Sequence, residues 1–208
     1  MTGDAEFRSG RLWAAMKLML ALALCSCACA TTTYNRGIPN LVQVDACVWR
    51  SGQPLKREQW ETLKGLGITH VAKLNFETEG SDNGARELGM VVESFAIEPR
   101  GDLDVFDAFA HTFKHPDESV VASADTYIRR FAPVTPADGQ VLCPIGKLLV
   151  HCTHGQDRTG FAIGRYQVVV HRMSKDTAYA EMKSHHFHSN LHGIADAWED
   201  WHPPAPVR

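Results

Sequence analysis

The segment 148–160 reads Leu-Leu-Val-His-Cys-Thr-His-Gly-Gln-Asp-Arg-Thr-Gly and holds the residue types best able to do chemistry. Its apolar start, with a β-branched valine, predicts a buried strand, and a helical pattern follows over residues 159–172. Cys152 therefore opens a tight strand-to-helix loop. A cysteine attacks as a thiolate, and a helix N-terminus or a nearby cation lowers its pKa from about 8.5 to roughly 3.5–7.5. The loop N–H groups and the Arg158 guanidinium would hold a tetrahedral dianion above this sulfur.

The other residues of the loop fit such an anion site. Gly155 permits a backbone conformation with positive φ, and the Thr159 hydroxyl can support the thiolate when sulfur is the leaving group. His151 is expected to steady the loop by hydrogen bonding. A buried cysteine before an ordinary glycine turn would not require an arginine at this spacing. We expect the bound anion to contact Thr153, His154, Gly155, Gln156, Asp157 and Arg158.

The pattern His-Cys-x5-Arg-Thr-Gly resembles the signature loop of the cysteine-dependent phosphatases, a superfamily of protein tyrosine, dual-specificity, inositide and phytase-like enzymes. The stretch Arg-Ser-Gly-Gln-Pro at residues 50–54 is similar to one found early in many bacterial and fungal dual-specificity phosphatases. The resemblance extends over roughly residues 41–201, densely only at the loop. It implies metal-independent hydrolysis of a phosphomonoester through a phosphocysteine on Cys152, without a cofactor. Rhodanese-type sulfur transfer also uses a cysteine loop, but without this set of residues.

Phosphate leaves poorly from an alkoxide, so a carboxylic acid is expected to protonate the leaving oxygen. His-Pro-Asp at residues 115–117 resembles the family's Trp-Pro-Asp loop, and Asp117 lies 35 positions before Cys152 (152 minus 117). The alternative is that Asp117 begins a helix running to residue 131. Asp157 is the second candidate, because Gly-x-Asp-Arg resembles the loop of myotubularin-type inositide phosphatases; it could instead anchor a neighbouring backbone or basic group. Weaker candidates lie upstream, namely Asp102, Asp104 and Asp107.

The Asp-Arg pair and the resemblance to bacterial phytase-like enzymes favour an inositol polyphosphate such as phytate as the substrate. A phosphoprotein is the alternative, with the chain acting as a protein tyrosine or dual-specificity phosphatase, and a non-catalytic phospho-ligand binding module is a further one. A phosphotyrosine pocket needs depth and an aromatic wall, whereas a phytate site needs several cations around a shallow mouth. Cations that could serve such a mouth are Lys114, Arg129, Arg130, Lys147, Arg165 and Lys183.

The surrounding pattern alternates strands and helices, which predicts a single α/β domain whose parallel or mixed sheet is flanked by helices. Strands are expected within residues 41–49, at 68–74, at 90–97 and at 148–150. Helices are expected at 55–66, 84–88, 161–173, 174–183 and 191–201. Catalytic loops belong at the carboxyl edge of such a sheet, where Cys152 would lie.

The chain of 208 residues divides into three predicted parts. Residues 1–30 carry a short apolar run after Lys17 and predict an export signal, which would give a secreted, periplasmic or outer-membrane protein. The sequence allows two ways of processing this signal. Ala-Cys-Ala at 28–30 fits a cleavage site, whereas Leu-Cys-Ser-Cys at 24–27 resembles a lipobox that would leave a lipid anchor on Cys27. Residues 34–202 form the phosphatase domain, and 203–208 a proline-rich tail. A net charge of −3 argues against nucleic-acid binding.

Two further groups of residues, the cysteines at 47 and 143 and a histidine cluster, each allow more than one interpretation. Cys47 and Cys143 could form a disulfide, or one of them could protect Cys152, but small buried hydrophobic side chains are the favoured interpretation. The histidines near residue 188 could bind a metal, because His188 and His192 lie one helical turn apart. A solvated rim of the site is favoured over a metal centre. The cluster comprises His185, His186, His188 and His192.

Overall fold

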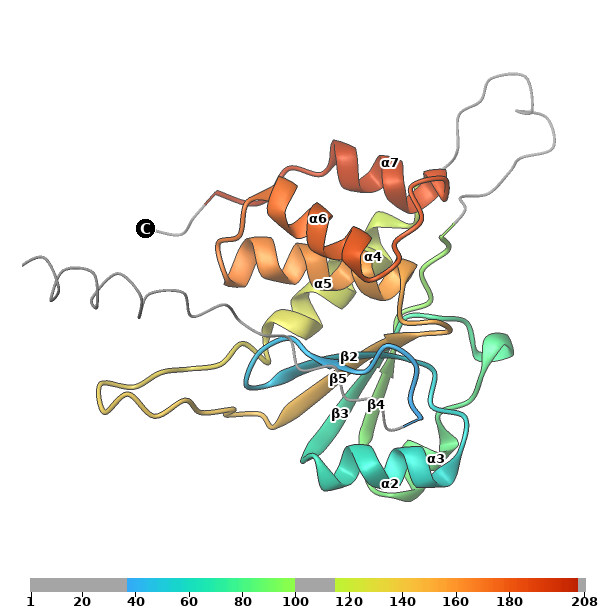
Figure 1. The fold of residues 1–208 in the computed structure, drawn as a ribbon, viewed down its shortest axis with the longest axis vertical. Coiled ribbons are helices and arrows are strands. Elements are labelled where there is room, and N and C mark those ends of the chain that lie inside the picture. Colours follow the sequence, from blue (N-terminus) through green and yellow to red (C-terminus); the bar gives the residue numbers. More distant parts are fainter. Residues whose placement is uncertain (1–36, 100–114, 206–208) are drawn as a thin grey trace, which may run out of the picture. The chain divides into compact units, whose positions relative to one another are not determined.

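A computed structural model describes residues 37–99 and 115–205, and in this part of the chain five strands form one sheet (Figure 1). The strands lie in the order β1-β2-β5-β3-β4, and all neighbouring pairs are parallel except β1 with β2. Their bounds are β1 Val42–Gln43, β2 Val48–Gly52, β3 Ile68–Lys73, β4 Val91–Ser94 and β5 Lys147–Cys152. The predicted single α/β domain with a mixed sheet is thereby confirmed.

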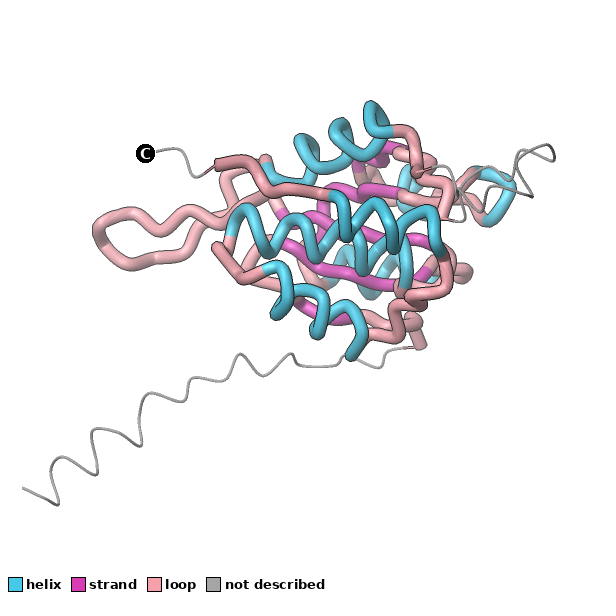
Figure 2. Tube along the Cα trace, turned by 90° about the horizontal axis from the view of Figure 1, so that it is seen from above, coloured by secondary structure: helices cyan, strands magenta, loops and turns pink. Residues whose placement is uncertain are grey.

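Helices cover both faces of the sheet, with α4 to α7 on one side and α2 and α3 on the other (Figures 1 and 2). They are α2 Arg57–Gly65, α3 Asn83–Glu87, α4 Glu118–Arg129, α5 Asp157–Val170, α6 Lys175–Ser184 and α7 His192–Asp200, with a 3₁₀ turn, η1, at Glu77–Glu79. Strand β5 alternates between the two faces. Leu148 and Val150 pack in the core below α4 to α7, whereas Leu149 belongs to the core below α2 and α3.

Most predicted elements are present with shifted ends. Helix α5 begins at Asp157 because a carboxylate is favourable in a first helical turn. Strand β4 ends at Ser94, earlier than the expected residue 97. Strand β2 continues through Gly52, because residues 48–52 pair with β5 along their whole length. The sequence pattern did not predict η1.

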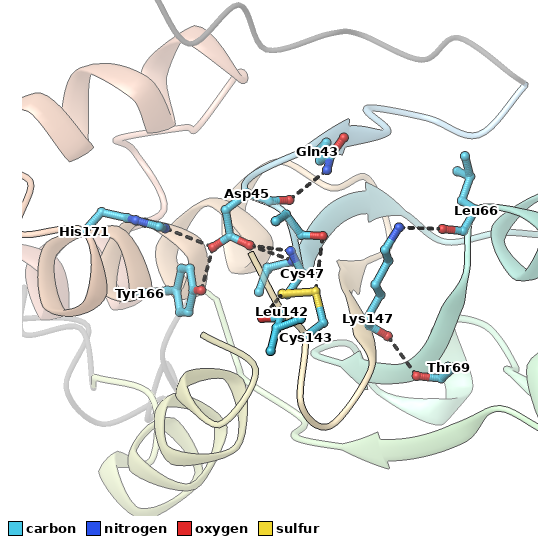
Figure 3. Close-up of a disulfide and its surroundings, with 12 residues drawn as sticks. Gln43, Asp45, Cys47, Leu66, Thr69, Leu142, Cys143, Lys147, Tyr166 and His171 are labelled. Carbon is cyan, nitrogen blue, oxygen red and sulfur yellow. Dashed lines mark hydrogen bonds and ion pairs between the residues drawn. A yellow bond between two sulfur atoms is a disulfide. The ribbon is translucent and has the colours of Figure 1, made fainter. Parts of the chain in front are cut away.

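A disulfide joins Cys47 to Cys143 across 96 sequence positions (Figure 3), so the preferred interpretation of two buried thiols was wrong. The bond fastens the long connection between α4 and β5 to the start of β2. Its neighbour Asp45 accepts hydrogen bonds from the N–H groups of Cys47 and Val48 and from the Tyr166 hydroxyl at 2.6 Å. With both cysteines bonded, neither can protect Cys152, which is the free cysteine of the described residues.

Several predictions concern segments that lie outside the described residues. They are the export signal at 1–30 with its lipid-anchor alternative, the candidates Asp102, Asp104 and Asp107, the cation Lys114 and the last three residues of the proline-rich tail. Within the described ranges, each helix is too short or too polar to cross a bilayer.

Candidate active site

Cys152 ends β5, between β2 and β3, and lies in a cleft of about 650 Å³. Only 4% of the residue is exposed. Every residue predicted to contact the anion, except Gly155, lines this cleft. The lining residues are Phe76, Glu79, Glu98, Pro99, Cys152, Thr153, His154, Gln156, Asp157, Arg158, His188, Asn190 and Leu191. The sequence therefore identified one wall of the cleft, and the other walls come from distant segments.

Three successive carbonyls of the loop accept hydrogen bonds from residues between Asn40 and Gln53, the stretch that carries β1 and β2. Gln53 N donates to Thr153 O at 3.1 Å, Asn40 Nδ2 to His154 O at 2.8 Å and Arg50 Nη2 to Gly155 O at 2.8 Å. A trans peptide is planar, and its C=O and N–H groups point in opposite directions. The N–H of each of these peptides therefore points away from the group that binds its carbonyl. This arrangement fits the predicted amide cradle.

Gly155 is the one position in the loop where glycine is required. Its φ is +73°, and a Cβ would lie 2.4 Å from Gly52 N and from the carbonyl carbon of Ser51. Any side chain would push the loop away from the end of β2. The loop and this strand are therefore packed backbone to backbone.

Arg158 forms a two-pronged ion pair with Glu79, which the sequence did not predict. Its Nη1 and Nη2 donate to the two carboxylate oxygens at 2.9 and 3.0 Å, and the Thr153 hydroxyl donates to the same carboxylate at 3.2 Å. Burial alone would raise the pKa of Glu79, but these hydrogen bonds and the Arg158 charge hold it below its usual value. Glu79 thus neutralises Arg158 at the base of the cleft.

A buried lysine fixes the turn that carries Glu79. Lys73, at the end of β3, is fully buried, and its Nζ contacts Glu77 Oε2 and the carbonyl oxygen of Gly80 on either side of Glu79. Because β3 is a neighbour of β5, η1 lies at the same carboxyl edge as Cys152. A carboxylate just after a neighbouring strand is the sequence signal that could have identified Glu79.

Asp157 lies at the rim of the cleft and contacts His188. Its Oδ1 accepts a hydrogen bond from His188 N at 2.8 Å and lies 3.0 Å from His188 Nδ1. The carboxylate therefore fastens the segment between α6 and α7 to the start of α5. This is the anchoring contact that the sequence left as one of two alternatives for Asp157.

The structure places Asp117 away from the cleft lining. It is the N-cap of α4, where its carboxylate accepts hydrogen bonds from Ser119 N and Oγ. The preceding His115 and Pro116 line a separate cavity of about 310 Å³, together with residues of α5 and α7. Of the two principal candidates for the acid, only Asp157 shares the cleft with Cys152.

His151 and Asp82 form a fully buried pair beside the nucleophile, with Nε2 and Oδ2 2.8 Å apart. Gln53 Nε2 donates to the other oxygen of Asp82 at 2.6 Å, and Asn75 Nδ2 donates to Gln53 at 3.1 Å. Burial raises the pKa of Asp82, but His151 and Gln53 more than offset this and lower it. His151 thus joins the loop strand to the segment before α3.

The other predicted cations and histidines contribute unequally. Among the described candidates, Arg129, Arg130, Lys147, Arg165 and Lys183 are all absent from the cleft lining, and Arg165 pairs with Asp125 at 2.6 Å. In the predicted histidine cluster, His188 lines the cleft and His192 lies 3.7 Å from Asp196. Within the described ranges, no three His, Cys, Asp or Glu side chains are arranged to hold a metal ion.

A family model described as the tyrosine phosphatase family matches residues 44–177, which include the loop, β2 and the start of α6. The chain belongs to the tyrosine phosphatase family. It is therefore a cysteine-dependent phosphatase, as the loop pattern predicted. A comparison with curated proteins gives no sequence match.

Solved structures share the fold of this tyrosine phosphatase family member. TpbA of P. aeruginosa has a TM-score of 0.51 and 19% identity, over 78% of this chain and 92% of that one. The core catalytic domain of the PP-IP phosphatase SIW14 of S. cerevisiae has a TM-score of 0.53 and 16% identity, over 78% and 85%. Tk-PTP has a TM-score of 0.51 and 18% identity, over 78% and 97%. At these identities the likeness concerns the fold alone.

Proposed function

We propose that the protein hydrolyses phosphomonoesters through a phosphocysteine intermediate on Cys152. The observation that carries this proposal is the convergence of Cys152, the loop backbone and Arg158 in one cleft. The thiolate attacks phosphorus, an S–P bond forms, and the P–O bond to the leaving group breaks as that oxygen takes a proton from solvent. Water then attacks the phosphocysteine, gives a proton back to solvent, and the S–P bond breaks to release phosphate and the thiolate.

Arg158 and Thr159 have distinct roles in this proposal. Arg158 holds oxygens of the phosphoryl group, with Glu79 fixing the plane of its guanidinium. Thr159 is fully buried, and its Oγ1 has no hydrogen-bond partner among the described residues. A buried hydroxyl without a partner is costly, so this one is available to the sulfur when the thiolate leaves.

For the substrate we favour an aryl phosphate, such as phosphotyrosine in a protein. In the described part of the cleft, Arg158 is the only arginine or lysine, and Glu79 neutralises it. The walls include the ring of Phe76, which lies 5.9 Å from the Arg158 guanidinium, with Pro99 and Leu191. A cleft with an aromatic wall and few cations suits a phenyl ring better than a polyphosphate.

Inositol polyphosphates such as phytate remain the second candidate. The Asp-Arg sequence at 157–158 supports it, and one structure of similar fold is described as a PP-IP phosphatase. His154 and His188 also line the cleft and offer ring N–H donors to further phosphates.

Phosphate release from a phosphotyrosine peptide and from phytate, measured side by side at pH 5 and pH 7, tests the substrate. We expect a larger kcat/KM on the peptide at both pH values. Cys152→Ser should abolish release from both substrates, because a serine hydroxyl is a far weaker nucleophile than a thiolate. Release that persists in this variant would refute the phosphocysteine route, whereas a larger kcat/KM on phytate would overturn the substrate assignment.

We also propose that the protein is exported, which places the phosphatase outside the reducing cytosol. The bond between Cys47 and Cys143 supports this, because disulfides persist in oxidising compartments. Fractionation of cells that express the full chain, with labelling by a radioactive fatty acid, would separate the soluble form from the lipid-anchored one. Recovery of the unprocessed chain in the cytosol would contradict the proposal.

A further inference from the structure

Arg50 is a buried arginine behind the phosphate-binding loop. It lies on β2, pairs in register with Val150 of β5, and is 1% exposed. Strand alternation places it on the same face as Val48, below α5 and α6. Its Nη2 donates to Gly155 O at 2.8 Å, and that nitrogen lies 3.8 Å from the position of a Cβ on Gly160. The side chain therefore reaches the loop from the sheet side.

A buried guanidinium needs a nearby negative charge, because removing such an ion from water costs several kcal/mol. Burial lowers the pKa of Arg50 to about 10, and the charges of Cys152 and Glu181 act in the opposite direction. Arg50 therefore stays a cation at neutral pH. The same charge, added to burial, lowers the pKa of His185 to about 4, so His185 is neutral there.

The other charged groups around Cys152 are already paired. Arg158 of α5 is bound to Glu79, and His151 of β5 is bound to Asp82. The carboxylate of Glu181 in α6 and the thiolate of Cys152 are the two negative charges that act on Arg50. Of the described cations near the sulfur, Arg50 alone is fixed to the loop backbone.

The hydrogen bond to Gly155 O determines the orientation of one peptide group. With that carbonyl held toward the sheet, the N–H of Gln156 points to the opposite side, which is the side of the cleft that Gln156 lines. Gly155, at φ +73°, has a conformation that Gly adopts without steric cost. Without a donor beneath it, this glycine peptide could rotate and present its oxygen to the anion.

We propose that Arg50 is a positioning residue of this phosphatase: it holds the Gly155 carbonyl away from the anion site and supports the Cys152 thiolate from beneath the loop. This inference rests on the proposed function of the loop as a phosphate site. It also gives the Arg-Ser-Gly-Gln-Pro stretch at 50–54 a physical role. The arginine contributes the hydrogen bond to Gly155, and Gln53 N contributes the one to Thr153 O.

The test compares Arg50→Met and Arg50→Lys with the wild-type full chain. Arg57→Met is the matched control, because Arg57 is an exposed arginine of α2 whose ion pairs lie outside the cleft. Iodoacetamide alkylation at pH 6 is followed on the peptide that contains Cys152, with and without inorganic phosphate. The slowing of alkylation by phosphate measures anion binding without any turnover. Hydrolysis of p-nitrophenyl phosphate gives kcat and KM.

Arg50→Met should weaken phosphate protection by about tenfold or more and slow the alkylation, since it removes a hydrogen bond from a charged donor. Arg50→Lys should keep the alkylation rate within about threefold but still weaken protection, because it retains the charge and loses the fork. If Arg50→Met does not fold, the Arg50→Lys result decides alone. Protection and alkylation within about twofold of wild type in the folded variants would overturn the role of Arg50. A wild-type chain that phosphate protects but that hydrolyses no phosphomonoester would instead refute the proposed function.

Discussion

Replacing Asp157 by asparagine separates the two roles that its position allows. The Asp157 carboxylate faces the backbone N–H of His188 at 2.8 Å and the ring Nδ1 at 3.0 Å. Asparagine keeps an oxygen that can accept the hydrogen bond from His188 N, and it removes the negative charge that faces the His188 ring. Because the His188 side chain is 54% exposed, this charge contributes no more than about 1 kcal/mol. If Asp157 is an anchor, kcat/KM should fall by about fivefold at most, whatever the leaving group.

A general acid behaves differently, since it contributes about 10²- to 10⁴-fold and matters most for poor leaving groups. The assay compares kcat/KM of D157N on p-nitrophenyl phosphate and on an alkyl phosphate. We expect the same small loss on both. Asp176→Asn, in the exposed first turn of α6, is the matched control. A loss above about 100-fold that is confined to the alkyl ester would refute the anchoring argument and identify Asp157 as the proton donor.

Three further predictions concern stability and the support of the loop. Replacing Cys47 and Cys143 by serine opens a cross-link over 96 positions, so Tm should fall by about 10 °C; an unchanged Tm would mean that the bond does not constrain the unfolded chain. Burial, with the nearby Arg50 charge, lowers the pKa of His185 from 6.5 to about 4. Between these two pH values the histidine is protonated in the unfolded chain but not in the folded one, so the free energy of unfolding should fall as the pH drops from 6.5 to about 4. Urea titrations of His185→Gln should show a flatter pH dependence, and an equal slope would contradict this. Asp82→Ala leaves His151 buried without its partner and should lower the free energy of unfolding in denaturant by about 3 kcal/mol, and Asp82→Asn should lower it less. If both variants were as stable as the wild type, the pairing would be refuted.

The central part of the fold could be predicted because local signals agree there. The apolar run ending at Cys152 and the helical pattern that follows it give β5 and α5 directly. The sequence offered the disulfide as one alternative but could not decide for it, because only the folded chain brings the Cα atoms of Cys47 and Cys143 to 5.5 Å. The extension of β2 through Gly52 likewise depends on pairing with β5, which no local pattern reveals.

The same distinction applies within the site. Residues inside the loop were predictable, since loop geometry and residue type together determine their chemistry. Three partners of the loop were not, because they come from segments at least 69 positions away. Glu79, Asp82 and Arg50 contact Arg158, His151 and Gly155 at separations of 79, 69 and 105 residues.

The charges that these partners bring have a consequence for recognition. Glu79 cancels the charge of Arg158 at short range, so a phosphate dianion in the cleft meets a nearly neutral ion pair. The remaining attraction must come from the loop N–H groups and the start of α5, whose dipoles act only over short distances. Such a site recognises one phosphoryl group held in contact and gains little from additional phosphates around it. This argues for a monoester on an aromatic carrier. It also makes the orientation of the loop peptides, including the Gly155 peptide whose carbonyl Arg50 binds, more important than the net charge of the cleft.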